Sequence, residues 1–244
     1  MERTTNKRVT SAKPPSKAER AAMADASGMK AEVAALKRER ILETATQLFL
    51  HNGYHGCSMD AIAQAIGVTK PFIYYQFRDK SEILAAICSQ GAELSLSALD
   101  QAEAQYKTAT ERMQAFCFRL TQVVVDRGHY LAVYLRETGS LDDADRKKIL
   151  RLRAEIDERV TQLVASGVKT GEFEVADPAI AARAITGMIS NIFHWHRKDR
   201  PPAPDEFTRI MADIAMRTLL GTSKEASRSV TSKKKGRGVN NEKA

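Results

Sequence analysis

The sequence predicts an all-α protein with a small N-terminal helical domain and a larger C-terminal one. Apolar residues recur at helical spacing along most of the chain, strand-type alternation is scarce, and Gly, Pro and capping residues separate the periodic stretches. The length of 244 residues suits one large or two small domains. We divide the chain into 1–28, 29–84, 85–221 and 222–244, and we expect the first and last segments to be disordered basic arms.

The charge of the chain is concentrated in these arms. The formal net charge is +8, of which residues 1–20 carry +4 and residues 222–244 carry +5, so the remainder is close to neutral. No apolar run approaches the length of a membrane span, and the N-terminus lacks the apolar segment of a secretory signal. Three widely spaced cysteines show no metal-type spacing. The sequence therefore predicts a cytoplasmic protein without membrane contact, metal or cofactor.

The N-terminal domain is expected to begin with a helix over residues 37–52, or from Met29, whose apolar stripe ends before Gly53. Two short helices follow, one over 59–66 behind the N-cap Ser58 and one behind Thr69, separated by Gly67. A longer helix is expected from 80 to about 106, with Asp79 as its N-cap and Glu82 as the partner in a capping box. It would connect the two domains.

The C-terminal domain is expected to contain five further helices. The breaks between them are placed at Thr108–Thr110, at Gly128, at Gly139-Ser140, from Gly167 to Pro178 and at the prolines that precede residue 204. The predicted ranges are 109–127, 129–138, 142–168, 178–198 and 204–219.

Residues 58–77 have the pattern of a helix-turn-helix, in which the second helix enters the major groove of DNA. Lys70 is suited to guanine or phosphate, Phe72 to a thymine methyl group and Tyr75 to phosphate. Lys80 is placed as a phosphate clamp at a helix N-terminus. The same pattern would also fit an ordinary helical hairpin with aromatic residues in its core. The predicted DNA-binding residues are Ser58, Thr69, Lys70, Phe72, Tyr74, Tyr75, Gln76 and Lys80.

A family resemblance favours the DNA-binding interpretation. The stretches 40–54, 58–69 and 73–84 resemble the N-terminal domain of the tetracycline-repressor (TetR) family, and the shared positions include Gly53, Gly67 and Phe77. Gln76, where the family often has His, and Pro71 inside the recognition helix depart from the pattern. The resemblance implies a homodimeric repressor of a palindromic double-stranded DNA operator. It also implies a C-terminal domain that holds a small-molecule inducer and the dimer interface.

The C-terminal domain suggests where these two functions lie. Residues 188–200 resemble a subgroup of the family that senses acyl-CoA thioesters, which would need an apolar slot and cations. The predicted pocket residues are Phe116, Arg119, Leu120, Val123, Tyr130, Tyr134, Arg136 and Arg159, and Arg183 or Arg197 could also meet anionic groups. The last two helices would pair with a second copy through Ile185, Met188, Ile192, Trp195, Phe207, Ile210, Met211 and Ile214, although these stripes could also pack within their own domain.

Two other classes of function remain open. One is a helical ligand-binding or protein-interaction module without sequence-specific DNA binding. The other is an enzyme, for which no nucleophile–base motif occurs, so we expect no catalytic residues. His194 and His196 project about 200° apart on a helix, so they are not expected to share a metal ion.

Overall fold

The computed structural model describes the backbone of residues 17–197 and 199–221, and the side chains from Gly28 onward except Lys198. Within these residues the chain forms eight α-helices and two short 3₁₀ turns, at Thr138–Ser140 and Ile192–His194. The helices are α1 (Lys17–Asn52), α2 (Met59–Ile66), α3 (Lys70–Gln76), α4 (Lys80–Gln105), α5 (Ala109–Glu137), α6 (Asp143–Thr170), α7 (Pro178–Ser190) and α8 (Pro204–Leu219). The predicted all-α class is confirmed.

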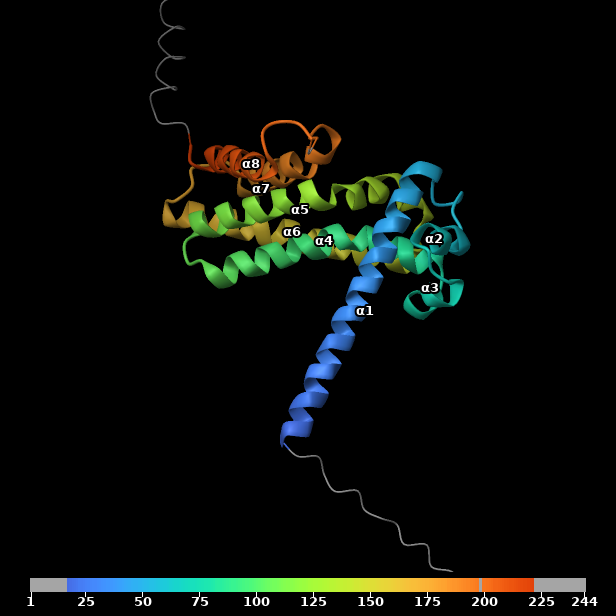
Figure 1. Ribbon diagram of the computed structural model, residues 1–244. Coiled ribbons are helices and arrows are strands. Elements are labelled where there is room, and N and C mark those ends of the chain that lie inside the picture. Colours follow the sequence, from blue (N-terminus) through green and yellow to red (C-terminus); the bar gives the residue numbers. More distant parts are fainter. Residues whose placement is uncertain (1–16, 198, 222–244) are drawn as a thin grey trace, which may run out of the picture.

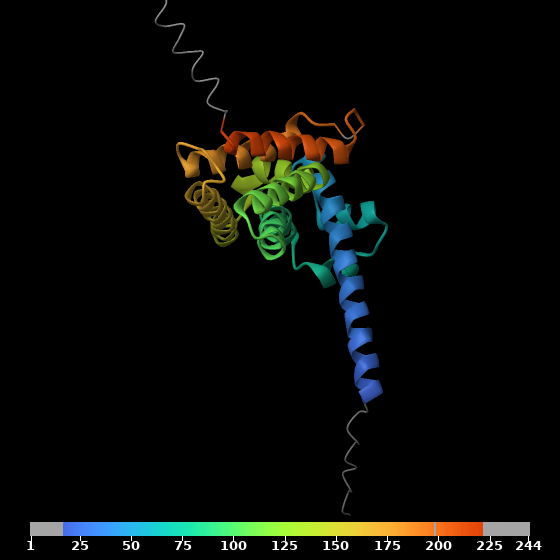
Figure 2. The same ribbon diagram turned by 90° about the vertical axis from the view of Figure 1, so that its left-hand side faces the viewer.

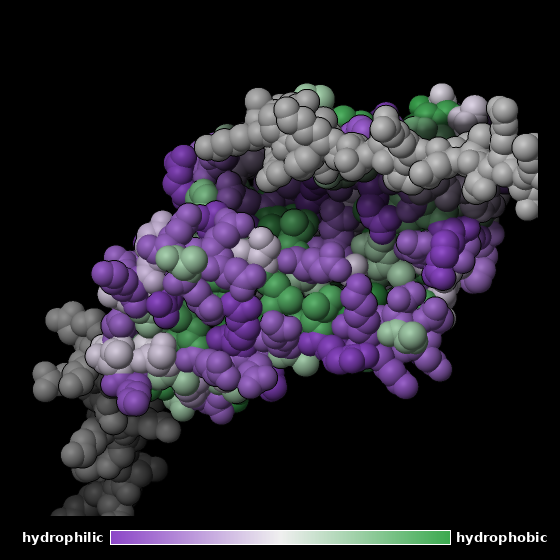
Figure 3. Space-filling model, turned by 90° about the horizontal axis from the view of Figure 1, so that it is seen from below, coloured by the Kyte–Doolittle hydropathy of each residue, from purple (hydrophilic) through white to green (hydrophobic). Residues whose placement is uncertain are grey.

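The helices form a small head and a larger body (Figure 1). The head consists of α2, α3 and the part of α1 that packs on them, and the body is the bundle of α4 to α8. The helices α7 and α8 cover one side of α5, while α4 and α6 lie on its other side (Figures 1 and 2). The underside of the molecule in Figure 3 is mostly polar, with apolar groups showing only between polar side chains.

Each region has its own apolar core. The body core contains buried residues of α4 to α8, among them Phe116, Cys117 and Leu163. The head core contains Ile41, Phe49, Ile62, Ile73 and Phe77, and it continues into the body through α4 and the ends of α5 and α6. The residues of this continuation are Ile83, Leu84, Ile87, Cys88, Tyr130, Val133, Leu141 and Ile149. The head is therefore seated on one end of the body by a shared core.

Helix α1 is longer than the sequence predicts. It begins at Lys17, so residues 17–28, which we expected to be disordered, are helical. Its N-terminal part projects away from the body past α3 (Figures 1 and 2). Residues 1–16 of the N-terminal arm and the whole C-terminal arm, residues 222–244, lie outside the described residues.

Two glycines that we expected to break helices lie inside them. Gly128 is in the middle of α5, where a Cβ atom would lie 2.6 Å from Cβ of Phe193. Gly167 is in α6, where a Cβ atom would collide with the ring of Phe173, and α6 ends instead at Gly171, which has a φ of +79°. Both glycines permit close packing rather than a turn. The expected helix over 178–198 is also too long, because α7 ends at Ser190.

Candidate functional site: an exposed helix-turn-helix and a cationic cavity

The turn between α2 and α3 forms as the sequence predicts. The hydroxyl of Ser58 accepts a hydrogen bond from the amide of Ala61 at 3.1 Å, which caps α2. Gly67 ends α2 with a φ of +81°, in the left-handed region that favours glycine, and its amide donates to the carbonyl of Ala63 at 3.0 Å. Thr69 occupies the N-cap position of α3 without a side-chain hydrogen bond.

Burial of one side of α3 fixes which side chains it presents outward. Ile73 and Phe77 are buried in the head core, and the tyrosines Tyr74 and Tyr75 lie on the opposite side. Tyr75 is 86 % exposed, which is unusual for so large an aromatic ring. Ser58, Thr69 and Lys70 are exposed as well. Five of the eight predicted DNA-binding residues are therefore exposed on the surface of the head.

The other three predicted residues are partly buried. Phe72 packs against the head core with the ammonium group of Lys37 lying 5.5 Å from its ring centroid, so only part of the ring is available to a base. Gln76 is half-buried at the end of α3. The ammonium group of Lys80 donates to the carbonyls of Tyr54 and Cys57 at 2.8 and 2.7 Å. Lys80 is therefore a structural tie within the head, and only its third N–H is left for the expected phosphate contact.

Lys70 forms an ion pair that can be exchanged. Its Nζ atom lies 3.0 Å from a carboxylate oxygen of Asp60, and both side chains are more than half exposed. Exposed pairs of this kind contribute little free energy, because water and salt screen the two charges. Lys70 can therefore leave Asp60 for a guanine or a phosphate at small cost.

Arg38 belongs to the head and was not predicted. Its Nη1 atom donates to the backbone carbonyl of Gln76 at 3.0 Å, and its guanidinium carbon lies 3.9 Å from the ring centroid of Phe77. It therefore attaches the C-terminal end of α3 to α1. The basic cluster at residues 37–40, next to the apolar stripe of α1, is the signal in the sequence that could have indicated it.

The body contains a cavity of about 340 Å³ between α4, α5, α6 and α7. Four predicted pocket residues line it: Leu120, Val123, Tyr130 and Tyr134, which share one side of α5. Its volume is at the lower end of the range for small-molecule sites. Cys88 also lines it, and burial raises the pKa of this thiol to about 12, so the thiol is protonated at neutral pH.

The other four predicted pocket residues lie elsewhere. Phe116 is fully buried in the body core. Arg119 donates to the side chains of Gln101 and Gln105, and Arg136 donates to the carbonyl of Leu50. Arg159 forms ion pairs with Asp100 and Glu103, each at 2.8 Å. These arginines bind partners on neighbouring helices, which the sequence alone does not place beside them.

The further candidate Arg183 and two arginines that were not predicted provide the positive charge of the cavity. Arg127, Arg153 and Arg183 line it, together with a single carboxylate, that of Asp157. The guanidinium carbon of Arg153 lies 4.9 Å from the ring centroid of Tyr134. Within the described residues, neither Arg153 nor Arg183 forms an ion pair with a carboxylate. The cavity wall therefore combines apolar surface with cations that are available to a ligand.

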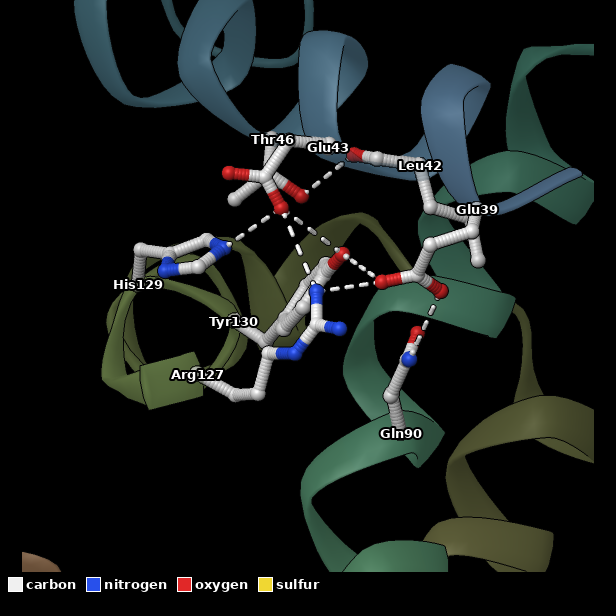
Figure 4. A network of polar contacts seen from close by, with 8 residues as sticks. All are labelled: Glu39, Leu42, Glu43, Thr46, Gln90, Arg127, His129 and Tyr130. Carbon is white, nitrogen blue, oxygen red and sulfur yellow. Dashed lines mark hydrogen bonds and ion pairs between the residues drawn. The ribbon is translucent and has the colours of Figure 1, made fainter. Parts of the chain in front are cut away.

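A polar network connects this cavity wall to the head (Figure 4). Nη1 of Arg127 pairs with Oε1 of Glu39 and lies 3.4 Å from Oε2 of Glu43, both on α1. The hydroxyl of Tyr130 donates to the same two carboxylates at 3.4 and 3.3 Å. Burial, and then the charges of Glu39 and Glu43, raise the pKa of Tyr130, so its hydroxyl stays protonated.

The predicted dimer residues divide into two groups. Ile185, Ile192, Phe207 and Met211 are buried in the body core, and Met188 is half-buried against it, so these side chains pack within their own domain. Trp195, Ile210 and Ile214 are exposed, at 57, 43 and 41 %. Ile180, on the same apolar stripe of α7, is exposed as well. This exposed apolar surface of α7, α8 and the turn between them is the part of the prediction that is left for a partner.

The described part of the chain contains neither a cluster of metal ligands nor a membrane-spanning helix. No group of three or more His, Cys, Asp or Glu residues there is placed to hold a metal ion. No helix among the described residues is both long and apolar enough to cross a membrane.

The fold and the head together define a helix-turn-helix transcriptional regulator. Residues 41–87 match the family "Bacterial regulatory proteins, tetR family", and residues 106–219 match "Tetracyclin repressor-like, C-terminal domain". The two matches together span more than half of the chain. The chain belongs to the tetR family.

Individual relatives agree with this assignment. The chain is 33 % identical over 78 residues to the transcriptional activator FasR of Mycolicibacterium smegmatis, an alignment that covers 32 % of this chain and 34 % of FasR. The chain thus matches about a third of the length of that curated relative. The regulator PfmR of Thermus thermophilus is 29 % identical, with a TM-score of 0.65 over 73 % of this chain and 97 % of PfmR.

A second similar structure was solved with ligands. It is AibR in complex with isovaleryl coenzyme A and operator DNA, which is 25 % identical to the chain. The TM-score is 0.61, and the match covers 73 % of this chain and 97 % of AibR.

Proposed function

We propose that the chain is a cytoplasmic, ligand-responsive repressor that binds a palindromic operator as a homodimer and is released by a small-molecule inducer. The observation that carries the proposal is the combination of an open reading surface on α3 with a cation-lined apolar cavity in the same chain. Tyr74, Tyr75 and Lys70 are exposed where a recognition helix would meet the major groove. No catalytic role is assigned to any residue.

The inducer is proposed to be an amphiphilic anion, and an acyl-CoA thioester is the first candidate. Apolar groups of α5 suit an acyl chain, and Arg153 and Arg183 suit anionic groups. The complex of AibR with isovaleryl coenzyme A supports this choice. Isothermal titration with isovaleryl-CoA, with coenzyme A as the control, tests it, and an affinity no higher than that for coenzyme A would exclude this acyl group.

The homodimer is proposed to form through the exposed apolar surface of α7 and α8. Its members Trp195, Ile210 and Ile214 would bury apolar area against a second copy. Light scattering should give the mass of a dimer for the full chain and of a monomer for the double variant Ile210→Asp/Ile214→Asp. Leu150→Asp, on the exposed side of α6, is the matched control and should leave the dimer intact.

DNA recognition is tested by selecting binding sites from random double-stranded DNA. We expect a palindromic consensus whose half-sites are about 10 base pairs apart, or a compatible multiple, because two copies of α3 must reach successive major-groove faces. Tyr75→Ala should weaken all sites by about tenfold, and Lys70→Ala should change the preference among them. Tyr106→Ala, at an exposed tyrosine that follows α4, is the control. Absence of any enriched sequence would favour the alternative, a ligand-binding module without DNA recognition.

A further inference from the structure

Arg127 lies on two surfaces that have different functions. It lines the cavity on one side, and its guanidinium group pairs with Glu39 and Glu43 of α1 on the other. Figure 4 shows both carboxylates directed at the same guanidinium group, with the hydroxyl of Tyr130 beside them. The ion pairs therefore join the wall of the cavity to the helix that carries the head.

The residue next to Glu39 in the sequence contacts α3 directly. Arg38, the residue before Glu39, donates to the carbonyl of Gln76 at the end of α3. Consecutive residues of a helix point about 100° apart, so α1 can hold α5 with one side chain and α3 with the next. Arg127 is thus connected to α3 through only two residues, Glu39 and Arg38, which are adjacent on α1.

An anionic ligand can compete for the ion pairs that Arg127 forms with Glu39 and Glu43. Glu39 and Glu43 share one guanidinium group, and all three side chains are about one-third exposed, so the pairs are neither sealed from water nor fully screened. A guanidinium group binds a ligand carboxylate or phosphate with the same geometry that it uses for Glu. If it turned to such a ligand, two carboxylates one helical turn apart would lose their shared cation and repel each other.

We propose that an anionic group of the ligand competes with Glu39 and Glu43 for Arg127, and that this exchange loosens α1 from α5 and releases the head from its DNA-binding position. This inference rests on the proposed function and adds the ligand's charge and the residue that senses it. It requires reciprocity: DNA that holds the head in place must lower the affinity for the ligand by the same factor by which the ligand lowers the affinity for DNA.

The first experiment measures ligand affinity by calorimetry on the full chain. The probes are octanoate and octanoyl-CoA, which present a carboxylate and the phosphates of coenzyme A, and octanol is the neutral control. Glu39→Gln/Glu43→Gln should bind the effective anion at least about fivefold more tightly, which corresponds to about 1 kcal/mol, because its competitors are gone. Asp100→Asn/Glu103→Gln, a carboxylate pair that shares Arg159 outside the cavity, is the matched control and should bind like the unaltered chain.

The second experiment measures coupling to DNA with the selected operator. In the unaltered chain the anion should weaken operator binding by about tenfold or more. In Glu39→Gln/Glu43→Gln operator binding should already be weak, and the anion should change it less than twofold. A variant that keeps the full coupling would overturn the proposal, as would a gain in affinity that the control pair shares.

A third measurement needs no substitution. Saturation with the effective anion should speed hydrogen exchange of the α1 amides near Glu39 and Glu43, and unchanged exchange would overturn the proposal. If neither octanoate nor octanoyl-CoA binds more tightly than octanol, the inference fails while operator selection can still succeed. If no operator is selected, the proposed repressor itself fails, so the two failures are distinguishable.

Discussion

The two halves of α5 differ in what surrounds them. The N-terminal half is packed solid up to Cys117: Met113, Phe116 and Cys117 are fully buried in the body core. The C-terminal half lines the cavity with Arg127, Tyr130 and Tyr134 and also contacts α1 of the head. One helix thus supports the body along its first half and separates a cavity from the head along its second.

This difference indicates how stability and responsiveness can be separated within one helix. Dry, close-packed cores have one arrangement and resist change. Partly exposed ion pairs beside a cavity can be rearranged with a smaller change in free energy. Substitutions in the first half should therefore change the stability of the whole chain, and those in the second half should change mainly the junction with the head.

The largest effect is expected from Phe116→Ala in the solid half. Removing a fully buried ring leaves a cavity in the body core, which should lower the free energy of unfolding by about 3–5 kcal/mol. Urea denaturation followed by circular dichroism measures it. Phe118→Ala, at a half-buried ring on the edge of the same core, should cost clearly less. Equal losses would show that this half is not packed as described.

The second effect concerns the boundary between the two halves. In Gly128→Ala the new Cβ atom would lie 2.6 Å from Cβ of Phe193, so the turn after α7 must move, at a cost of about 1–3 kcal/mol. Gly91→Ala in α4 meets nothing within 4 Å and should stabilise the chain by about 0.5–1 kcal/mol. Thermal unfolding compares the two variants, and destabilisation by both would mean that close approach to Phe193 is not the cause.

The third largest effect is expected from removing the hydroxyl of Tyr130, which joins α5 to α1. Tyr130→Phe removes the donor to Glu39 and Glu43 and should cost about 1 kcal/mol, with the loss confined to the attachment of α1. Hydrogen exchange of α1 amides reports this local change. Within the described residues the hydroxyl of Tyr134 has no hydrogen bond, so Tyr134→Phe should stay within about 0.5 kcal/mol of the unaltered chain.

The smallest effect is expected at the start of α5 and depends on pH. The carboxylate of Glu172 accepts hydrogen bonds from the amides of Thr110 and Ala109 and from the hydroxyl of Thr170. The bonds from Thr110 contribute most to lowering the pKa of Glu172 from its ordinary 4.5 to about 2.

A lowered pKa in the folded state means that this stabilisation is present above about pH 4.5 and is lost as the pH falls to about 2. Glu172→Gln should therefore unfold at a slightly lower temperature than the unaltered chain at neutral pH, and the difference should disappear on acidification. A difference that is the same at pH 7 and pH 2.5 would contradict this assignment.

Local signals explain which elements the sequence could predict. The bounds of α2 and α3 depend on Ser58, Gly67 and Pro71, which act within a few residues of where they stand. The sequence wrongly predicts a helix break at Gly128, because the role of this glycine depends on Phe193, which is far away in the sequence. A glycine that allows close approach and a glycine that ends a helix look the same in the sequence.

The same distinction explains the cavity. Its apolar residues on α5 were predictable because Leu120, Val123, Tyr130 and Tyr134 follow the helical period. Its arginines were predictable only in part: Arg183 was a candidate and Arg153 was not, whereas the candidate Arg159 pairs with carboxylates of another helix. Helical spacing identifies the face of a helix, but the partner of a charged side chain depends on tertiary packing.

The length of α1 gives the head a mechanical property. The part of α1 from Lys17 to Glu39 is about 33 Å long at a rise of about 1.5 Å per residue, and it projects beyond α3 (Figure 2). As a rigid rod pivoting near Glu39, it would convert a tilt of about 5° into a displacement of about 3 Å at its tip. A rearrangement of the ion pairs of Glu39 and Glu43 would thus be magnified into a movement of about 3 Å at the far end of α1.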